Sequence, residues 1–125
     1  MFYGSKFTEV PHIEGLNSLG YCFCSCSNLE TIESLGVDKL AASSSVFSEA
    51  FSGCKALKNL TIIGTIKFGI NVSVCPLTHD SLMSIINALE QKTSGTFTVT
   101  LGSSNLAKLT DAEKAIATDK GWTLA

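Results

Sequence analysis

The sequence contains no arginine. All nine basic residues are lysines, and the 125-residue chain has a net charge of −2. Proteins that bind nucleic acid usually present a basic surface on which arginine side chains contact phosphates and guanine edges. The composition therefore argues against a nucleic-acid partner, and the same shortage of basic residues argues against binding to an acidic membrane surface.

Long hydrophobic runs are also missing. No apolar segment approaches the roughly 20 residues that a membrane-spanning helix needs, so no membrane insertion is expected. Residues 1–11 show neither the basic start nor the apolar block of a secretory signal peptide. Because these residues already read as part of a structural repeat, we interpret the chain as the C-terminal fragment of a longer gene product.

Recognisable catalytic motifs are absent. The sequence contains no G-x-S-x-G, no H-E-x-x-H and no phosphate-binding glycine loop. A cysteine nucleophile needs a histidine within hydrogen-bond reach, and His12 and His79 lie outside any catalytic motif. We therefore expect no enzyme, with no catalytic, cofactor-binding or metal-binding residues.

An internal repeat is present in the first half of the chain. Four apolar residues in "AFSGCKALKNLTI" each follow an equivalent residue by 28 positions; the pairs are Phe23 and Phe51, Cys26 and Cys54, Leu29 and Leu57, and Ile32 and Leu60. A third, shorter copy starts at Phe2, and with one residue deleted its Val10 matches Leu60. A unit of this size cannot bury its apolar face alone, so we expect the copies to stack, with their phenylalanines in a ladder.

The order of residues within the repeat resembles the BspA-type leucine-rich repeat. "AFSGCKALKNLTI" is close to that family's typical unit, whereas "FCSCSNLETI" has Ser25 where glycine is usual. The resemblance implies a short right-handed solenoid with parallel strands, on a bacterial surface protein or in a phage-associated protein. This sequence departs from the family in its spacing of about 28 residues. We place the insertion in residues 34–50 as a solvated loop followed by a short helical turn.

The second half of the chain has the pattern of alternating helices and strands. Apolar residues at i, i+3, i+4 and i+7 predict a helix over about 79–91, with Thr78 as its N-cap and Asp80 in its first turn. "TFTVTLG" predicts a strand with Phe97, Val99 and Leu101 facing inward.

The C-terminal segment has clear helix boundaries. Thr110 and Glu113 form a capping-box pattern, Ala112, Ala115 and Ile116 give a small apolar face, and Gly121 ends the helix. A final strand carries Trp122, which we expect to be buried. Residues 1–75 are thus interpreted as about three repeats. Residues 76–125 are interpreted as a helix–strand–helix–strand cap with a βαβ unit that continues the parallel sheet of the same domain.

The cysteines invite three interpretations. Cys22, Cys24 and Cys26 alternate along the chain, which suits neither a tetrahedral zinc site nor a disulfide among themselves. In the repeat alignment Cys26 is equivalent to Cys54, which favours buried packing for Cys22 and Cys26 and exposure for Cys24. A disulfide involving Cys75 and a metal site are the remaining alternatives.

The expected function follows from the repeats. Repeat arrays of this kind form extended surfaces that bind other molecules. We expect a non-enzymatic module that binds a protein or a glycan, outside the cell or at its surface by family resemblance. The alternative is a structural or assembly segment of a larger repeat or phage tail protein, self-associating through an uncapped N-terminal end.

Overall fold

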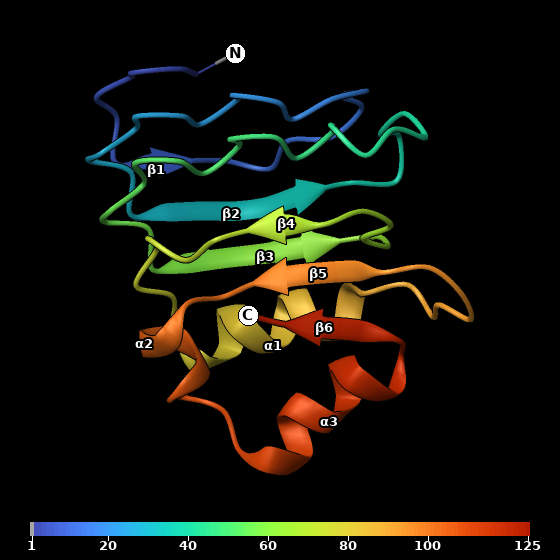
Figure 1. Ribbon diagram of the computed structural model, residues 1–125. Coiled ribbons are helices and arrows are strands. Elements are labelled where there is room, and N and C mark those ends of the chain that lie inside the picture. The colour runs from blue at the N-terminus through green and yellow to red at the C-terminus, as the bar shows by residue number, and fades with distance from the viewer. Residues whose placement is uncertain (1) are drawn as a thin grey trace.

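Two parallel β-sheets of three strands each organise a mixed α/β fold in the computed structural model, which describes residues 2–125 (Figure 1). Met1, the first residue of the expected repeat region 1–75, lies outside the described residues. The first sheet contains β1 (Glu9–Val10), β2 (Thr31–Gly36) and β3 (Asn59–Ile63), and the second contains β4 (Ile70–Asn71), β5 (Phe97–Thr100) and β6 (Trp122–Leu124). The helices are α1 (His79–Ala88), α2 (Ser103–Leu106) and α3 (Asp111–Asp119).

The register of the first sheet follows the repeat alignment. Val10 pairs with Ile32, and Ile32 pairs with Leu60. All three side chains are buried, because equivalent inward positions of parallel strands stack on one another. The alignment of the three copies, including the one-residue deletion in the first, is therefore confirmed as far as Ile32 and Leu60. Beyond them the register shifts by one residue, so that Leu35 pairs with Ile62.

The expected phenylalanine ladder is also present. The rings of Phe2 and Phe23 stack with centroids 5.5 Å apart and planes 8° apart, and those of Phe23 and Phe51 stack at 5.8 Å and 13°. Phe23 and Phe51 are almost completely buried. Phe23 and Phe51 thus belong to the hydrophobic core, and Phe2 packs against it.

Backbone hydrogen bonds join the turns that carry these phenylalanines. The amide of Phe2 donates to Cys22, that of Phe23 donates to Ala50, and that of Ser25 donates to Ser52. The turn segments 2–5, 19–26 and 46–54 therefore lie one above another. Within residues 34–50 only turns follow the end of β2, so the short helical turn expected there is not formed.

The second sheet corrects the expected arrangement of the C-terminal half. The βαβ unit does not continue the sheet of the repeats, because β4, β5 and β6 pair only with one another. In Figure 1 their arrows point in the direction opposite to those of β1–β3. The parallel pairing of β5 with β6 was predicted correctly, and buried residues of both halves share one hydrophobic core.

The edge of β3 explains why the first sheet stops there. The hydroxyl of Ser81 accepts a hydrogen bond from the amide of Leu60 at 2.9 Å, and that of Ser84 accepts one from the amide of Ile62 at 2.8 Å. Both serines belong to α1, so this helix occupies the position of a further strand. Unpaired strand amides are otherwise a template for aggregation, and α1 satisfies them with side chains.

The helix α1 is shorter than expected. Thr78 caps it by accepting from the amide of Ser81, and Asp80 lies in its first turn, as predicted. The helix ends at Ala88 rather than near residue 91, since Leu89 adopts an extended backbone and forms a parallel bridge with Ile66. The amide of Ile66 donates to Ala88 at 2.7 Å. Tertiary pairing overrides the helical pattern at this end.

The helix α3 has the predicted capping box, in which Thr110 and Glu113 exchange hydrogen bonds. Its buried apolar residue is Ala117, whereas Ala112 is exposed, so the expected apolar face is shifted. Gly121 follows the helix at a φ of +87°. A side chain there would begin 2.7 Å from the carbonyl oxygen of Lys92, which explains the glycine.

Trp122 and Asn105 complete the core near the C-terminus. Trp122 is 2% exposed and donates its indole N–H to the carbonyl of Glu90, so it packs as expected. Asn105, in the unexpected short helix α2, is buried and donates to the carbonyls of Cys75 and Leu101 at 2.9 and 2.8 Å. No helix among residues 2–125 has the length and apolarity required to cross a membrane.

Candidate functional site

All five cysteines are free and buried. The expected exposure of Cys24 is wrong, because its side chain is only 8% exposed. The turn folds back so that the Cys24 amide donates to Tyr21, while the Cys24 carbonyl accepts from Gly4 of the preceding unit. The preceding unit thus covers Cys24, which a simple strand alternation would leave exposed to solvent.

Burial also makes the thiols poor nucleophiles. Desolvation raises the pKa of Cys54 and of Cys75 to about 12, and it raises the pKa of Cys22 and Cys26. The His12 imidazole lies against the hydroxyl of Ser34 rather than against a cysteine. Residues 2–125 contain no group of three or more His, Cys, Asp or Glu side chains arranged to hold a metal ion.

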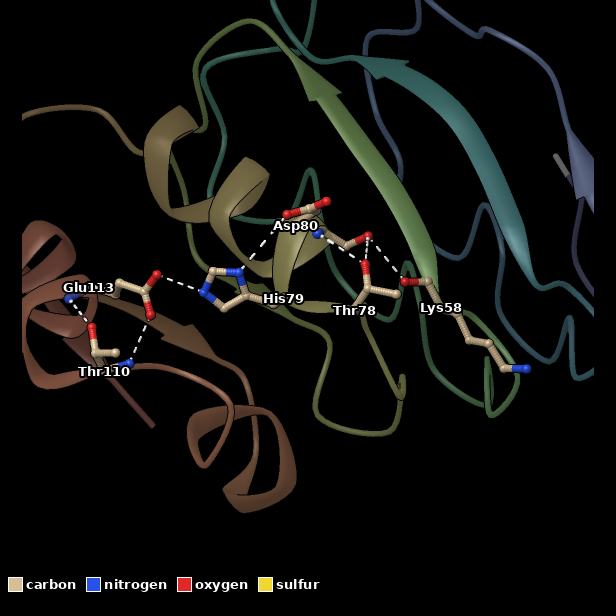
Figure 2. A network of polar contacts seen from close by, with 7 residues as sticks. Lys58, Thr78, His79, Asp80, Thr110 and Glu113 are labelled. Atoms are coloured by element: carbon tan, nitrogen blue, oxygen red, sulfur yellow. Dashed lines mark hydrogen bonds and ion pairs between the residues drawn. The ribbon is translucent and has the colours of Figure 1, made fainter.

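His79 belongs to a polar network that joins α1 to α3 (Figure 2). Its Nε2 atom lies 2.6 Å from a carboxylate oxygen of Glu113, and its Nδ1 atom lies 3.9 Å from Asp80. The Thr110 backbone N–H holds the pKa of the Glu113 carboxyl below its usual value, with a further contribution from His79. The network links the first turns of two helices.

The geometry of this network is that of a structural clamp. The Glu113 carboxylate already accepts a hydrogen bond from the amide of Thr110 at 2.8 Å. The Ser81 hydroxyl accepts one from the amide of Leu60 and donates one to the carbonyl of Lys58. The Glu113 Oε1 atom and the Ser81 hydroxyl therefore have backbone partners, and Glu113 Oε2 is paired with the His79 ring. We assign the network to helix docking.

A groove lined by hydroxyl groups lies between the turn 44–49 and the strands β4 and β5. It has a volume of about 390 Å³. Its polar lining comes from Ser44, Ser45, Ser48, Glu49, Asn71, Thr98 and Thr100. A smaller hollow of about 100 Å³ continues it, since Glu49 and Asn71 line both. Together they form what we call the hydroxyl groove.

The hydroxyl groove arises where the stacking of turns is interrupted. Segment 19–25 is hydrogen-bonded to segment 46–52, but among the described residues no backbone hydrogen bond joins segment 46–52 to β4. The register of β4 with β5 places Asn71 opposite Thr100, and Thr98 lies two residues along the same face. The groove is therefore walled by a turn on one side and by a sheet face on the other.

Glu49 adopts an unusual backbone conformation. Its φ is +54°, and Tyr21, 28 residues earlier and equivalent in the repeat, has a φ of +57°. A non-glycine residue in this region costs about 1–2 kcal/mol. Both side chains are exposed, so neither position is explained by core packing. Strained residues of this kind are often found at functional sites.

The sequence did not point to this groove. The serines at 43–45 predict only a solvated loop, and β4 has only 2 residues. The proximity of the serine segment to β4 therefore depends on the tertiary fold. A second polar surface is the exposed face of the first sheet, where the Asn59 amide donates to the hydroxyl of Thr31 at 3.1 Å. Glu33 and Thr61 are exposed on the same strands.

Comparisons with known proteins found no matching family model, no matching curated protein and no matching solved structure.

Proposed function

We propose that the chain is a non-enzymatic leucine-rich-repeat module that binds a protein or a glycan through its exposed faces. In this proposal residues 1–75 are about three units of a short right-handed solenoid, and residues 76–125 are its C-terminal cap. The observation that supports it most directly is the common register of the units, seen in the Val10–Ile32–Leu60 row and in the stacked rings of Phe2, Phe23 and Phe51.

Stacking in register has a consequence for binding. Equivalent outward positions of neighbouring units lie side by side, about 4.8 Å apart, so a ligand can contact several units at once. Most outward positions here are polar, as at Thr31, Asn59 and Thr61, and Ile63 at the end of β3 is the exposed apolar exception. The buried thiols and the pairing of His79 with Glu113 favour binding over catalysis.

The proposed setting is extracellular or at the surface of a bacterial cell. Free thiols persist in an oxidising environment when they are buried and carry raised pKa values, because the reactive thiolate is then scarce. The sequence upstream of this chain in its gene tests the setting. A signal peptide or an anchor supports it, and a cytoplasmic enzyme domain in its place contradicts it.

A binding assay tests the proposed function. The labelled protein is applied in solution to a glycan array and to immobilised secreted glycoproteins, before and after the glycans of those glycoproteins are removed. We expect saturable binding that decreases at least tenfold on changing one of the two polar surfaces, by Glu33→Lys with Thr61→Lys or by Ser48→Lys with Asn71→Lys. The variant Lys114→Ala on α3 is the control. Absence of saturable binding to every probe contradicts the proposal.

An assembly role is the second candidate. β1 is hydrogen-bonded along one edge only within the described residues, and Phe2 ends the aromatic ladder beside Tyr3, which is 64% exposed. A strand and an aromatic side chain can both extend the stack there. Light scattering over a range of protein concentrations separates the two roles. A strictly monomeric protein that binds ligand contradicts assembly.

A further inference from the structure

The hydroxyl groove is the site from which we infer a specific ligand class: we propose that it binds a neutral oligosaccharide. This inference rests on the proposed binding function and deepens it by naming the ligand chemistry and the site. The volume of about 390 Å³ lies in the range of roughly 300–1,000 Å³ that is usual for small-molecule sites.

The charge of the lining excludes several ligand classes. Glu49 is the one charged residue among those that line the two connected hollows. A single carboxylate repels phosphates, sulfates and acidic sugars, and it supplies too few oxygens for a hard cation such as Ca²⁺, which takes 6–8 ligands. The groove therefore suits an uncharged ligand.

The polar groups in the lining match a ligand that is dense in hydroxyls. Serine and threonine hydroxyls both donate and accept hydrogen bonds, and the carboxylate of Glu49 accepts only. The Asn71 Oδ1 atom already accepts from the amide of Ser73 at 2.9 Å, so the side-chain NH₂ of Asn71 is the group that can donate to a ligand. A pyranose ring offers neighbouring hydroxyls that can donate to a carboxylate and accept from an amide. Ser48, Glu49 and Asn71 are exposed, and Thr98 and Thr100 are half-buried, so all five can reach a ligand.

Gly69 also lines the groove, and a side chain at this position would begin 2.9 Å from the carbonyl oxygen of Thr98. Phe47 and Ile70 line it as well, but they are only 4% and 3% exposed. The surface that the groove offers is therefore chiefly polar, and it suits the hydroxyl edges of a sugar ring.

Tyr21 adds an aromatic surface next to the groove. Its amide donates to the carbonyl of Ser48 at 2.9 Å, which places the Tyr21 backbone directly against the wall of the groove. The side chain is 53% exposed, although tyrosine is usually packed where it serves stability. Tyr21 is not among the residues that line the groove, so its phenol can meet only a sugar unit that extends beyond the groove.

The conformations of Tyr21 and Glu49 support the assignment. Both residues have left-handed φ values at equivalent positions of consecutive units, and glycine is the residue that this backbone favours. The chain therefore keeps an exposed phenol and an exposed carboxylate at two neighbouring places where glycine would relieve strain. A peptide ligand is less suited to the groove, since it usually needs apolar pockets or an unpaired strand edge.

The experiment uses ¹H–¹⁵N NMR titration of the whole chain with four uncharged probes: maltotetraose, cellotetraose, chitotetraose and mannotetraose. We expect at least one probe to produce saturable shifts at the amides of Ser48, Glu49, Asn71 and Thr100. Glu49→Gln and Asn71→Ala should each weaken binding about tenfold, as removal of one or two good hydrogen bonds does. A hyaluronan tetrasaccharide, which is acidic, should cause no saturable shift.

Matched control variants lie on the helices, away from both polar surfaces. Asp111→Asn on α3 and Asn87→Ala on α1 make the same kinds of change at exposed positions and should leave the affinity unchanged, provided that the amide spectrum shows an intact fold. Tyr21→Leu should weaken binding, whereas Tyr3→Leu should not.

Two results would overturn the inference in different ways. Saturable shifts that map to β2 and β3 and depend on Glu33 or Asn59 would remove the groove assignment but leave the proposed binding function standing. Absence of saturable shifts anywhere with all four probes would remove the oligosaccharide assignment, while binding to deglycosylated protein in the array assay would still support a protein-binding module.

Discussion

The thiol of Cys54 donates a hydrogen bond to the backbone carbonyl oxygen of Phe23, at a distance of 3.0 Å. Phe23 belongs to the preceding unit, and Cys26 makes the equivalent contact with the carbonyl of Phe2 at 2.8 Å. The cysteine of each unit therefore joins its unit to the one before it. The small volume of the cysteine side chain and its weak S–H donor both contribute to this contact. An apolar residue of the same volume would lack the donor.

Serine substitutions of the cysteines should separate these contributions. In Cys54→Ser the hydroxyl inherits the carbonyl of Phe23 as an acceptor, so the free energy of unfolding should fall by about 1 kcal/mol or less. The thiol of Cys75 is equally buried. Its pKa is raised by desolvation and by Cys54, and no hydrogen bond to the thiol contributes to the shift. Cys75→Ser should therefore cost about 1–3 kcal/mol. Urea unfolding measures both, and equal losses would argue against a bonding role for the Cys54 thiol.

The end of the first sheet offers a second prediction. Ser81→Ala removes the acceptor of the Leu60 amide, and Leu60 is buried. An unsatisfied buried amide costs about 1–3 kcal/mol, so the variant should be destabilised by that amount. Hydrogen exchange of the Leu60 amide should accelerate more than that of the Ile62 amide, which retains Ser84 as its acceptor. The control is Ser94→Ala at an exposed site. Unchanged exchange at Leu60 would show that the Ser81 hydroxyl does not protect this amide.

The clamp between α1 and α3 predicts a dependence of stability on pH. The pKa of Glu113 in the folded chain lies below its ordinary value of 4.5, chiefly because the Thr110 backbone N–H donates to the carboxylate. Its stabilising contribution is therefore complete above pH 4.5 and is lost as the pH falls through the lower folded value. Thermal melts from pH 7 to pH 3 should show a smaller acid-induced loss in Glu113→Gln than in the unmodified protein.

The matched control for this experiment is Glu9→Gln, which removes an exposed carboxylate outside the clamp. Parallel pH profiles for Glu113→Gln and the unmodified protein would show that the carboxylate contributes nothing to the docking of the two helices.

Local patterns in the sequence predict much of this fold, and long-range pairing explains what they miss. The capping box of Thr110 and Glu113 and the N-cap Thr78 depend on residues three apart, so the sequence contains the whole of each motif. The repeat alignment predicts strand register because equivalent inward residues must stack. The end of α1 at Ala88 depends on Ile66, which has no distinctive pattern of its own. The alternation of apolar residues in 69–74 indicates a strand, but it does not specify that β4 pairs with β5 rather than with β3.

The candidate site could not be predicted for the same reason. Ser48 and Asn71 are separated along the chain by β3, and each belongs to a segment that reads as a polar loop or a very short strand. Only the interruption of turn stacking brings them to opposite walls of one groove. The exposure of Cys24 was predicted wrongly because strand alternation does not apply in a turn that the preceding unit covers.

Ser25 and Gly53 occupy equivalent positions of two consecutive units, and both have left-handed φ values, +62° and +79°. Glycine adopts this conformation without the steric cost that a Cβ atom introduces. Ser25→Gly should therefore stabilise the protein, by up to about 1 kcal/mol, because the relief of strain exceeds the greater freedom that glycine gives the unfolded chain.

The reverse exchange should have the opposite sign. A Cβ atom at Gly53 would lie 3.1 Å from the Cα atom of Ser25, so Gly53→Ser adds a close contact with backbone to the left-handed strain. We expect a loss of about 2 kcal/mol or more in urea unfolding. The double variant should lose less than the sum of the two single changes, since glycine at position 25 lets its backbone move away from the new side chain. Strict additivity of the two changes would show that the two turns do not press on one another.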